Sequence, residues 1–149
     1  MIFAKIGESS QTFSSKKPDG MIEMQYERPS AIHVVQSNGT WFLDIATQNQ
    51  LTAKQTRDNA VSANITVHGV DWQVANDAED IRKVIGDAET ISASEDDTTM
   101  FRLADNSWRE TTLSELRDVL KAHIARKQDV WNQMAAWDSG DKQSKFEVK

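Results

Sequence analysis

Apolar and polar positions divide this chain into a β-rich first part, residues 1–47, and a second part, residues 48–140, in which strands alternate with helices. In the first part, residues 31–36 and 40–46 are rich in β-branched and aromatic side chains. They flank Ser37-Asn38-Gly39, and an Asn-Gly pair favours a tight hairpin because both residues accept positive φ. The pattern therefore predicts a β-hairpin in the first part.

The two ends of the chain carry weaker signals. Residues 2–6 alternate weakly and predict a strand at a sheet edge, whereas residues 7–20 are rich in Ser, Thr and Lys and indicate a loop or mobile arm. Residues 141–149 are mostly polar and are expected to be frayed or ordered by a partner. Two or three short strands bury little apolar surface. We therefore expect the β-rich module, residues 1–47, to depend on the rest of the chain, on a second copy or on a partner.

The second part alternates helix-start signals with turn signals. Three residue pairs have the spacing of capping boxes and predict helix starts: Thr52 with Gln55, Asn76 with Glu79, and Thr112 with Glu115. Between them, His68-Gly69 and Asp105-Asn106 predict the turns of two hairpins. The last and longest helix is expected over residues 113–137. Such blocks of strands and helices are typical of an antiparallel sheet with helices on one face, so the predicted fold class is α+β.

The long helix carries an apolar stripe made of Leu113, Leu116, Leu120, Ile124, Trp131 and Met134. Two interpretations of its second half, residues 125–137, remain open. This half packs on the domain's own sheet and on the helix around Ile81, or it docks on a neighbouring subunit such as another copy. His123 and Lys127 interrupt a strict heptad repeat, which disfavours a long isolated coiled coil.

Tryptophan is unusually frequent, with five residues against one tyrosine. Trp41, Trp72 and Trp108 lie in predicted strands and are expected in the core. Trp131 and Trp137 lie in the long helix, beyond the part that the sheet covers most easily. Because tryptophan is enriched at the centres of protein interfaces, these last two are candidates for partner contact.

Composition restricts the classes of function. The chain has 149 residues, a formal net charge of −6 at pH 7 and no cysteine. Sequence-independent nucleic-acid binding needs a basic face, and anionic membranes repel acidic chains, so we expect neither partner. Without cysteine, the chain has no disulfides, thiolate zinc sites or cysteine nucleophiles. No apolar run reaches the roughly 18 residues of a membrane-spanning helix, and the apolar start is too short for a signal peptide.

Residues with catalytic or metal-binding chemistry do not form a known motif. His33, His68 and His123 are far apart in sequence, and none has the spacing of a metal-binding pair. Glu95-Asp96-Asp97 lacks the spaced ligands and the glycine of a calcium loop, so we interpret it as a solvated loop. Motifs of serine hydrolases and nucleotide-binding loops are also missing. We expect no enzymatic activity, no metal and no cofactor.

Motifs in both parts resemble proteins of tailed-bacteriophage tails. In the first part, the motifs that resemble the opening of small tail and tail-fibre assembly proteins are Pro18-Asp19-Gly20, Met24, Arg28-Pro29 and Gly39-Thr40-Trp41. The second part resembles a domain of unknown function found at the C-terminal end of phage tail proteins, in its hairpin at 66–70, helix after 76, strand and turn at 101–106 and helix at 113–137. Tail-fibre assembly chaperones of this family often end in an aromatic- and arginine-rich segment, and here residues 138–142 differ from that pattern.

The resemblance implies a non-enzymatic structural or adaptor protein of the distal tail, baseplate or tail fibre, made in the host cytoplasm and located in the virion tail. Its partners would be other phage tail proteins, and a homo-oligomer is also open. A tail-fibre assembly chaperone is the alternative function, and a receptor-binding module is a third hypothesis. Six residues are predicted to contact partners: Met24, Arg28, Pro29 and Trp41 from the resemblance, and Trp131 and Trp137 from their apolar surface.

Overall fold

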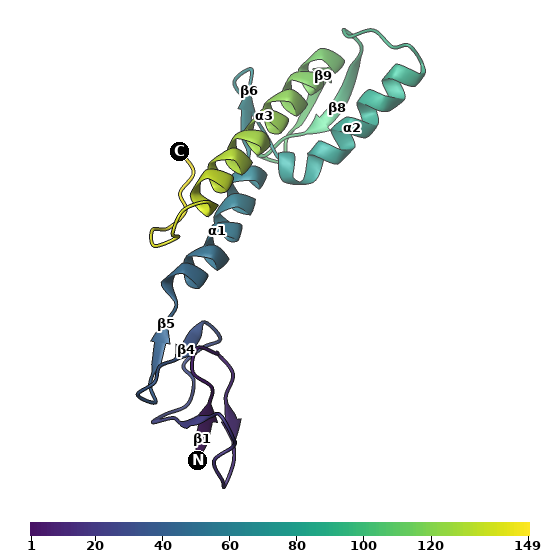
Figure 1. Ribbon diagram of the computed structural model, residues 1–149. Helices are drawn as coiled ribbons and strands as arrows, with labels where there is room; N and C mark the ends of the chain where they lie inside the picture. The colour runs from purple at the N-terminus through teal and green to yellow at the C-terminus, as the bar shows by residue number, and fades with distance from the viewer. The chain divides into compact units, whose positions relative to one another are not determined.

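The computed structural model describes residues 1–149, with the side chain of Asn76 outside the description. Its antiparallel strands and helices confirm the predicted α+β fold class (Figure 1). The described chain divides into two compact units. The N-terminal unit contains Met1–Ala53 and Gly140–Phe146, and the α+β unit contains Lys54–Ser139 and Glu147–Lys149. The division falls after Ala53, somewhat later than the predicted boundary after residue 47, and residues 140–146 join the N-terminal unit.

The N-terminal unit contains a three-stranded and a two-stranded antiparallel sheet. Their strand orders are β2(Thr12–Phe13)-β1(Ile2–Ala4)-β3(Ile22–Glu23) and β4(His33–Val35)-β5(Trp41–Leu43). The β4–β5 pair confirms the predicted hairpin, with Val35 opposite Trp41. The prediction of an edge strand at residues 2–6 is wrong, because β1 pairs on both sides. One of its partners, β2, lies in the segment predicted as a loop and is too short to produce a periodic signal.

A small core of its own supports the N-terminal unit. The buried residues Ala4, Met24, Val35 and Trp41 form one cluster. The Trp41 indole Nε1–H donates a hydrogen bond to the backbone oxygen of Tyr26 at 3.0 Å, so the polar end of this buried ring is also satisfied. Trp41 and Met24 therefore contribute packing to this unit.

Gly39 in the β4–β5 turn is expected to be difficult to replace. Its φ is +77°, and a Cβ added there would lie 2.7 Å from the backbone oxygen of Glu23. We expect Gly39→Ala to lower the free energy of unfolding of the N-terminal unit by more than about 1 kcal/mol, because side chains disfavour positive φ and the backbone contact adds to this cost. Urea unfolding measures the loss. Gly7→Ala is the matched control, since Gly7 has a φ of +81° and open space around its Cβ position. Equal losses in the two variants would contradict a close backbone approach at Gly39.

The first helix, α1 (Ile45–Ser62), begins earlier than predicted. Asp44 precedes it, and its carboxylate accepts hydrogen bonds from the Thr47 backbone N–H at 3.4 Å and the Thr47 hydroxyl at 2.6 Å. These bonds, the hydroxyl first, hold the pKa of Asp44 below its ordinary value. The predicted capping box at Thr52 and Gln55 is wrong, because Thr52 lies inside the helix and its hydroxyl donates to the backbone oxygen of Asn49 at 3.0 Å. An aspartate directly before the helix provides the cap instead.

The α+β unit contains two hairpins and two further helices. Their bounds are β6(Ile65–Val67), β7(Val70–Trp72), α2(Val74–Thr90), β8(Thr98–Arg102), β9(Trp108–Thr112) and α3(Leu113–Asp138). Both predicted hairpins are confirmed, and positive φ at His68 (52°), Gly69 (76°) and Asn106 (68°) accounts for their turns. In the described chain the hairpins are separate two-stranded sheets and do not join into the single expected sheet. Helix α2 begins at Val74, before the predicted start near residue 76, and the side chain of Asn76 lies outside the described residues.

The core of the α+β unit lies between its hairpins and the α2–α3 pair. Its buried residues are Trp72, Val74, Ile81, Ile85, Phe101, Leu116 and Val119. The rings of Trp72 and Phe101 lie 6.5 Å apart between centroids. Trp72 is thus a core residue as predicted, whereas the prediction for Trp108 is wrong, because this side chain is 65% exposed. Side chains alternate across a strand, and Trp108 lies opposite Arg102 in the register, on the face that Phe101 does not occupy.

Candidate interaction surface

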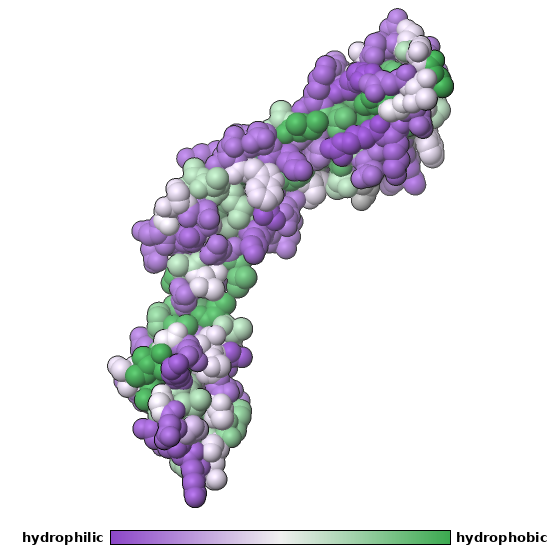
Figure 2. All heavy atoms as spheres, turned by 45° about the vertical axis from the view of Figure 1, so that its right-hand side comes forward, coloured by the Kyte–Doolittle hydropathy of each residue, from purple (hydrophilic) through white to green (hydrophobic). Residues whose placement is uncertain are grey.

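The α2–α3 groove is the surface of the α+β unit that best combines apolar and charged side chains. It consists of two hollows of about 400 and 140 Å³ that share Ile124. Its lining residues are Arg82 and Ile85 from α2, and Arg117, Leu120, Lys121, Ile124, Lys127, Gln128 and Trp131 from α3. On the face shown in Figure 2, hydrophobic side chains of this unit form a band bordered by hydrophilic ones.

The apolar side chains that α3 contributes to the α2–α3 groove lie along one face of the helix. Leu120, Ile124 and Trp131 stand four and seven residues apart, which places them on one face of α3. Ile124 is 49% exposed and Trp131 is 46% exposed, although the same helix buries Leu116 and Val119 completely. The first half of α3 therefore packs in the domain core. The second half buries Val130 but leaves Ile124 and Trp131 about half exposed to solvent.

Trp131 is held in place from helix α1. The Arg57 guanidinium lies 4.5 Å from the centroid of the Trp131 ring, a cation–π arrangement. Arg57 is itself fixed by Asp58, with Nη2 and Oδ1 2.7 Å apart. One side of the indole is thus engaged within the unit, and the side chain still lines the groove. A pre-positioned aromatic ring loses little conformational entropy when a partner packs on it.

The rim of the α2–α3 groove carries four cationic side chains, of which two have carboxylate partners within the unit. Arg117 pairs with Glu89 at 3.1 Å and with Glu95 at 3.0 Å. Lys121 lies 3.8 Å from Asp118, a loose pair.

The other two rim cations, Arg82 and Lys127, are exposed and form no ion pair with any other side chain that the structure describes. The groove therefore carries a local excess of positive charge in a chain whose net charge is −6.

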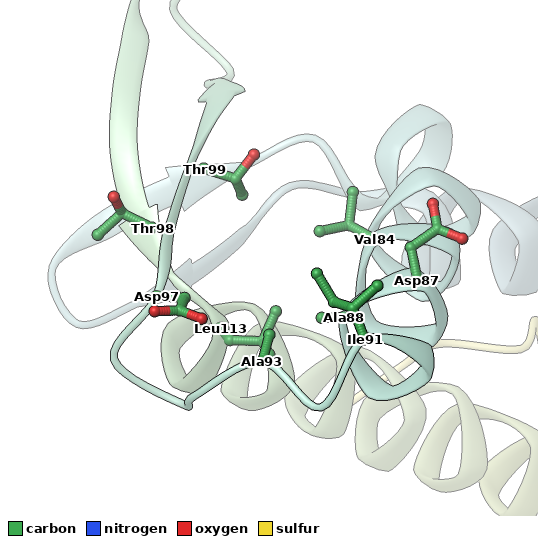
Figure 3. A pocket seen from close by; sticks show the side chains of 9 residues that line it. All are labelled: Val84, Asp87, Ala88, Ile91, Ala93, Asp97, Thr98, Thr99 and Leu113. Atoms are coloured by element: carbon green, nitrogen blue, oxygen red, sulfur yellow. The ribbon is translucent and has the colours of Figure 1, made fainter.

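A separate hollow, of about 490 Å³, lies at the end of α2, outside the α2–α3 groove (Figure 3). Val84, Ala88 and Ile91 lie across it from residues around Asp97 and Leu113. Its walls are mainly aliphatic. Its charged groups are two carboxylates, and that of Asp97 accepts a hydrogen bond from the Ser94 backbone N–H at 2.9 Å. Its lining contains no aromatic or cationic side chain, in contrast to that of the α2–α3 groove.

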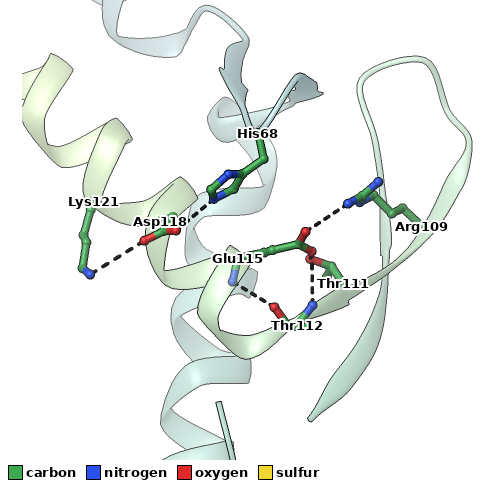
Figure 4. Close-up of polar contacts among 7 residues, drawn as sticks. All are labelled: His68, Arg109, Thr111, Thr112, Glu115, Asp118 and Lys121. Atoms are coloured by element: carbon green, nitrogen blue, oxygen red, sulfur yellow. Dashed lines mark hydrogen bonds and ion pairs between the residues drawn. The ribbon is translucent and has the colours of Figure 1, made fainter. Parts of the chain in front are cut away.

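The start of α3 carries a polar network that stabilises the fold (Figure 4). The Thr112 hydroxyl accepts from the Glu115 backbone N–H at 3.1 Å, and the Glu115 carboxylate accepts from the Thr112 backbone N–H at 3.3 Å, which confirms this predicted capping box. The Thr111 hydroxyl and the Arg109 guanidinium also donate to Glu115, at 2.6 and 3.0 Å. These bonds, that of Thr111 first, lower the pKa of Glu115. Every oxygen of this carboxylate is thus engaged in joining β9 to α3.

His68 and Asp118 form a second polar contact in the same region (Figure 4). His68 Nε2 lies 2.9 Å from Asp118 Oδ2, and both side chains are exposed. Histidine–carboxylate pairs also occur in catalytic triads, but no described hydroxyl forms a hydrogen bond with His68. The pair joins the β6–β7 turn to α3.

His123 lies buried in α3, in surroundings that disfavour its charged form. Its Nδ1 has no hydrogen-bond partner among the described atoms. Burial lowers its pKa, and the charges of Arg126, Arg82 and Lys127 lower it further. Since the folded-state pKa lies below the unfolded value of about 6.5, the unfolded chain takes up the proton first as the pH falls.

We therefore expect the α+β unit to lose stability as the pH is lowered from about 7 to about 5, and His123→Leu to lose less over this interval. Urea unfolding at several pH values measures both slopes. Asp77 acts in the opposite sense, because burial, followed by the charge of Asp80, raises its pKa. For this reason the test compares the slope of unfolding free energy against pH in the parent with the slope in His123→Leu. Identical slopes would contradict a role for His123.

The six residues predicted to contact partners occupy different environments. Met24 and Trp41 are buried in the N-terminal core, so we do not include them in the candidate surface. Arg28 is half-buried: its backbone N–H donates to Gln11 Oε1 at 2.7 Å, and its guanidinium donates to the backbone oxygen of Ser9. It thereby holds the segment before β2 in place. Pro29 is exposed beside it.

Trp131 lines the α2–α3 groove as a half-exposed residue, and Trp137 is half-buried further along α3. Sequence reasoning missed the two unpaired cations, Arg82 and Lys127, as parts of this surface. The sequence does place both cations next to apolar positions, since Arg82 stands between the apolar positions of α2 and Lys127 lies between Ile124 and Trp131. Only the packing of α2 against α3 places both on one groove.

The described part of the chain shows neither a metal-binding cluster nor a membrane-spanning helix. Within the described part of the chain, no group of three or more histidine or carboxylate side chains is arranged to hold a metal ion. None of the described helices combines the length and the apolar character needed to cross a membrane. No protein-family model, curated protein or solved structure matches this chain.

Proposed function

We propose that this chain is a non-enzymatic structural adaptor of a bacteriophage tail that acts through protein–protein contacts. The main support for a role in protein contact is the α2–α3 groove, in which Ile124 and Trp131 remain about half exposed on a folded unit. Exposed apolar surface bordered by charged side chains is characteristic of interaction sites. The assignment to a phage tail is supported by the motifs around Arg28-Pro29 and Gly39-Thr40-Trp41 and by the order of elements in the second part of the sequence.

The adaptor role suits the division of the chain into two units. Each unit has a hydrophobic cluster of its own, one around Trp41 and one around Leu116. Under this proposal the α+β unit contacts one tail protein through the α2–α3 groove. The N-terminal unit attaches to another through the exposed surface beside Arg28 and Pro29.

Quantitative mass spectrometry of purified particles, and of the lysate from which they come, tests the proposed function. We expect the chain in mature particles at a fixed ratio to the major tail proteins, which act as internal standards. If the chain is abundant in the lysate but missing from particles, the structural role is wrong and an assembly chaperone replaces it. If the chain is missing from both while the standards are detected, the phage-tail assignment is overturned.

A further inference from the structure

We propose that the α2–α3 groove binds an acidic amphipathic helix of a partner protein. This inference rests on the proposed role in protein contact and adds to it the chemistry of the partner. It is independent of the phage-tail assignment, because it depends only on the side chains of the groove.

The shape of the groove fits a helix. Its α3 wall extends from Arg117 to Trp131, which at the rise of an α-helix corresponds to about 20 Å, or roughly four turns. Apolar side chains recur along this length at Leu120, Ile124 and Trp131. A bound helix with apolar residues at positions i, i+3 or i+4, and i+7 would match this spacing, which is how amphipathic helices occupy grooves.

The positive charge of the groove favours a partner helix with negatively charged side chains. Arg82 from α2 and Lys127 from α3 both line the hollow that contains Trp131, and neither has an ion-pair partner in the described structure. Arg117 is already neutralised by Glu89 and Glu95. At physiological salt, exposed charges act over about 8 Å, so Arg82 and Lys127 act most strongly on a ligand inside the groove. Carboxylates flanking the apolar face of a bound helix would pair with Arg82 and Lys127.

The chain's own helices are poor candidates for this occupant, so we assign the groove to a different protein. Helix α2 is acidic near its start, but its apolar residues Ile81 and Ile85 are buried in its own core. Helix α1 has few apolar positions, and among them Ala53 is already buried. The first half of α3 is likewise used internally through Leu116 and Val119. Its second half carries Lys127, which would meet the like charges of Arg82 and Lys127 in the groove of a second copy.

A displayed peptide library tests this inference on the full-length protein. The library consists of helix-forming peptides of about 14 residues with a constant apolar face, whose flanking positions vary among Asp, Glu, Lys, Arg, Gln and Ser. We expect the selected peptides to be enriched about tenfold in Asp and Glu at these positions, corresponding to about 1.4 kcal/mol of preference.

Matched variants test whether the selected peptides bind in the α2–α3 groove. Arg82→Glu/Lys127→Glu is expected to lose the acidic preference, and Ile124→Asp to lose binding. Lys54→Glu/Lys83→Glu makes the same change of charge at exposed positions outside the groove and is expected to behave as the parent. Circular dichroism confirms that each variant is folded. A selection without acidic preference, no selected peptides, or an unchanged result with Arg82→Glu/Lys127→Glu would overturn the inference. Particle mass spectrometry decides the phage-tail role separately, so failure of one proposal is distinguishable from failure of the other.

Discussion

Replacing Leu116 with alanine is expected to lower the free energy of unfolding of the α+β unit by about 2–5 kcal/mol, the range for large-to-small changes in well-packed cores. Leu116 is completely buried in the first half of α3, in the cluster that contains Trp72 and Ile81. The strands and helices around Leu116 can move only partly into the space that its side chain leaves, so Leu116→Ala would leave a cavity in the core. Domains of this size are stable by only about 5–15 kcal/mol, so this loss is a large fraction of the total.

Urea unfolding followed by far-ultraviolet dichroism measures the effect of Leu116→Ala. Leu120→Ala is the matched control, because it makes the same chemical change four residues later on the same helix. Leu120 is only partly buried and lines the α2–α3 groove, so we expect a clearly smaller loss. Similar losses at the two positions would show that the first half of α3 is not the centre of this core.

Replacing Trp41 with alanine is expected to unfold the N-terminal unit. Trp41 is the largest side chain of the cluster it forms with Ala4, Met24 and Val35, and truncation of a buried tryptophan costs about 3–5 kcal/mol. The change also removes the hydrogen bond from Nε1 to the backbone oxygen of Tyr26. Short two- and three-stranded sheets have little stability to lose, so a cost of this size exceeds what the unit can tolerate.

Amide spectra of ¹⁵N-labelled protein show which unit responds to Trp41→Ala. Signals of β1, β4 and β5 should collapse to unfolded positions. Those of β8, β9 and most of α3 should persist, because their core contains no residue of the N-terminal cluster. Trp108→Ala is the control, since its side chain is 65% exposed and its loss should change stability by less than about 0.5 kcal/mol. Persistence of the N-terminal signals in Trp41→Ala would show that the unit does not depend on this residue.

Local chemistry made several elements predictable. The turn at Asn38-Gly39 and the turn at His68-Gly69 are specified by residues that accept positive φ, whatever surrounds them. The start of α3 at Thr112 and Glu115 is specified by side chains three positions apart that satisfy each other's backbone groups. Such interactions span only a few residues, so the sequence pattern contains both partners.

Predictions failed where long-range pairing or packing decides the outcome. The position of β1 between two strands depends on Thr12–Phe13, a two-residue strand without a periodic pattern. The start of α1 was placed at Thr52 because its spacing to Gln55 resembles a cap, although Asp44 is the cap that the fold uses. Trp108 was expected in the core because aromatic residues favour strands, but β-propensity does not say which face of a hairpin is covered.

The candidate surface shows the same division. The sequence predicts the α+β class, the three hairpin turns, the length of α3 and the apolar stripe along it, because each follows from local periodicity and turn chemistry. It left open whether the second half of that stripe is covered. The packed fold shows that Leu116 is buried while Ile124 and Trp131 stay half exposed. It also shows that Arg82 of α2 and Lys127 of α3 line the same groove. The physical reason is that exposure and charge pairing depend on which helices pack together, and residues that meet in this way are distant in the sequence.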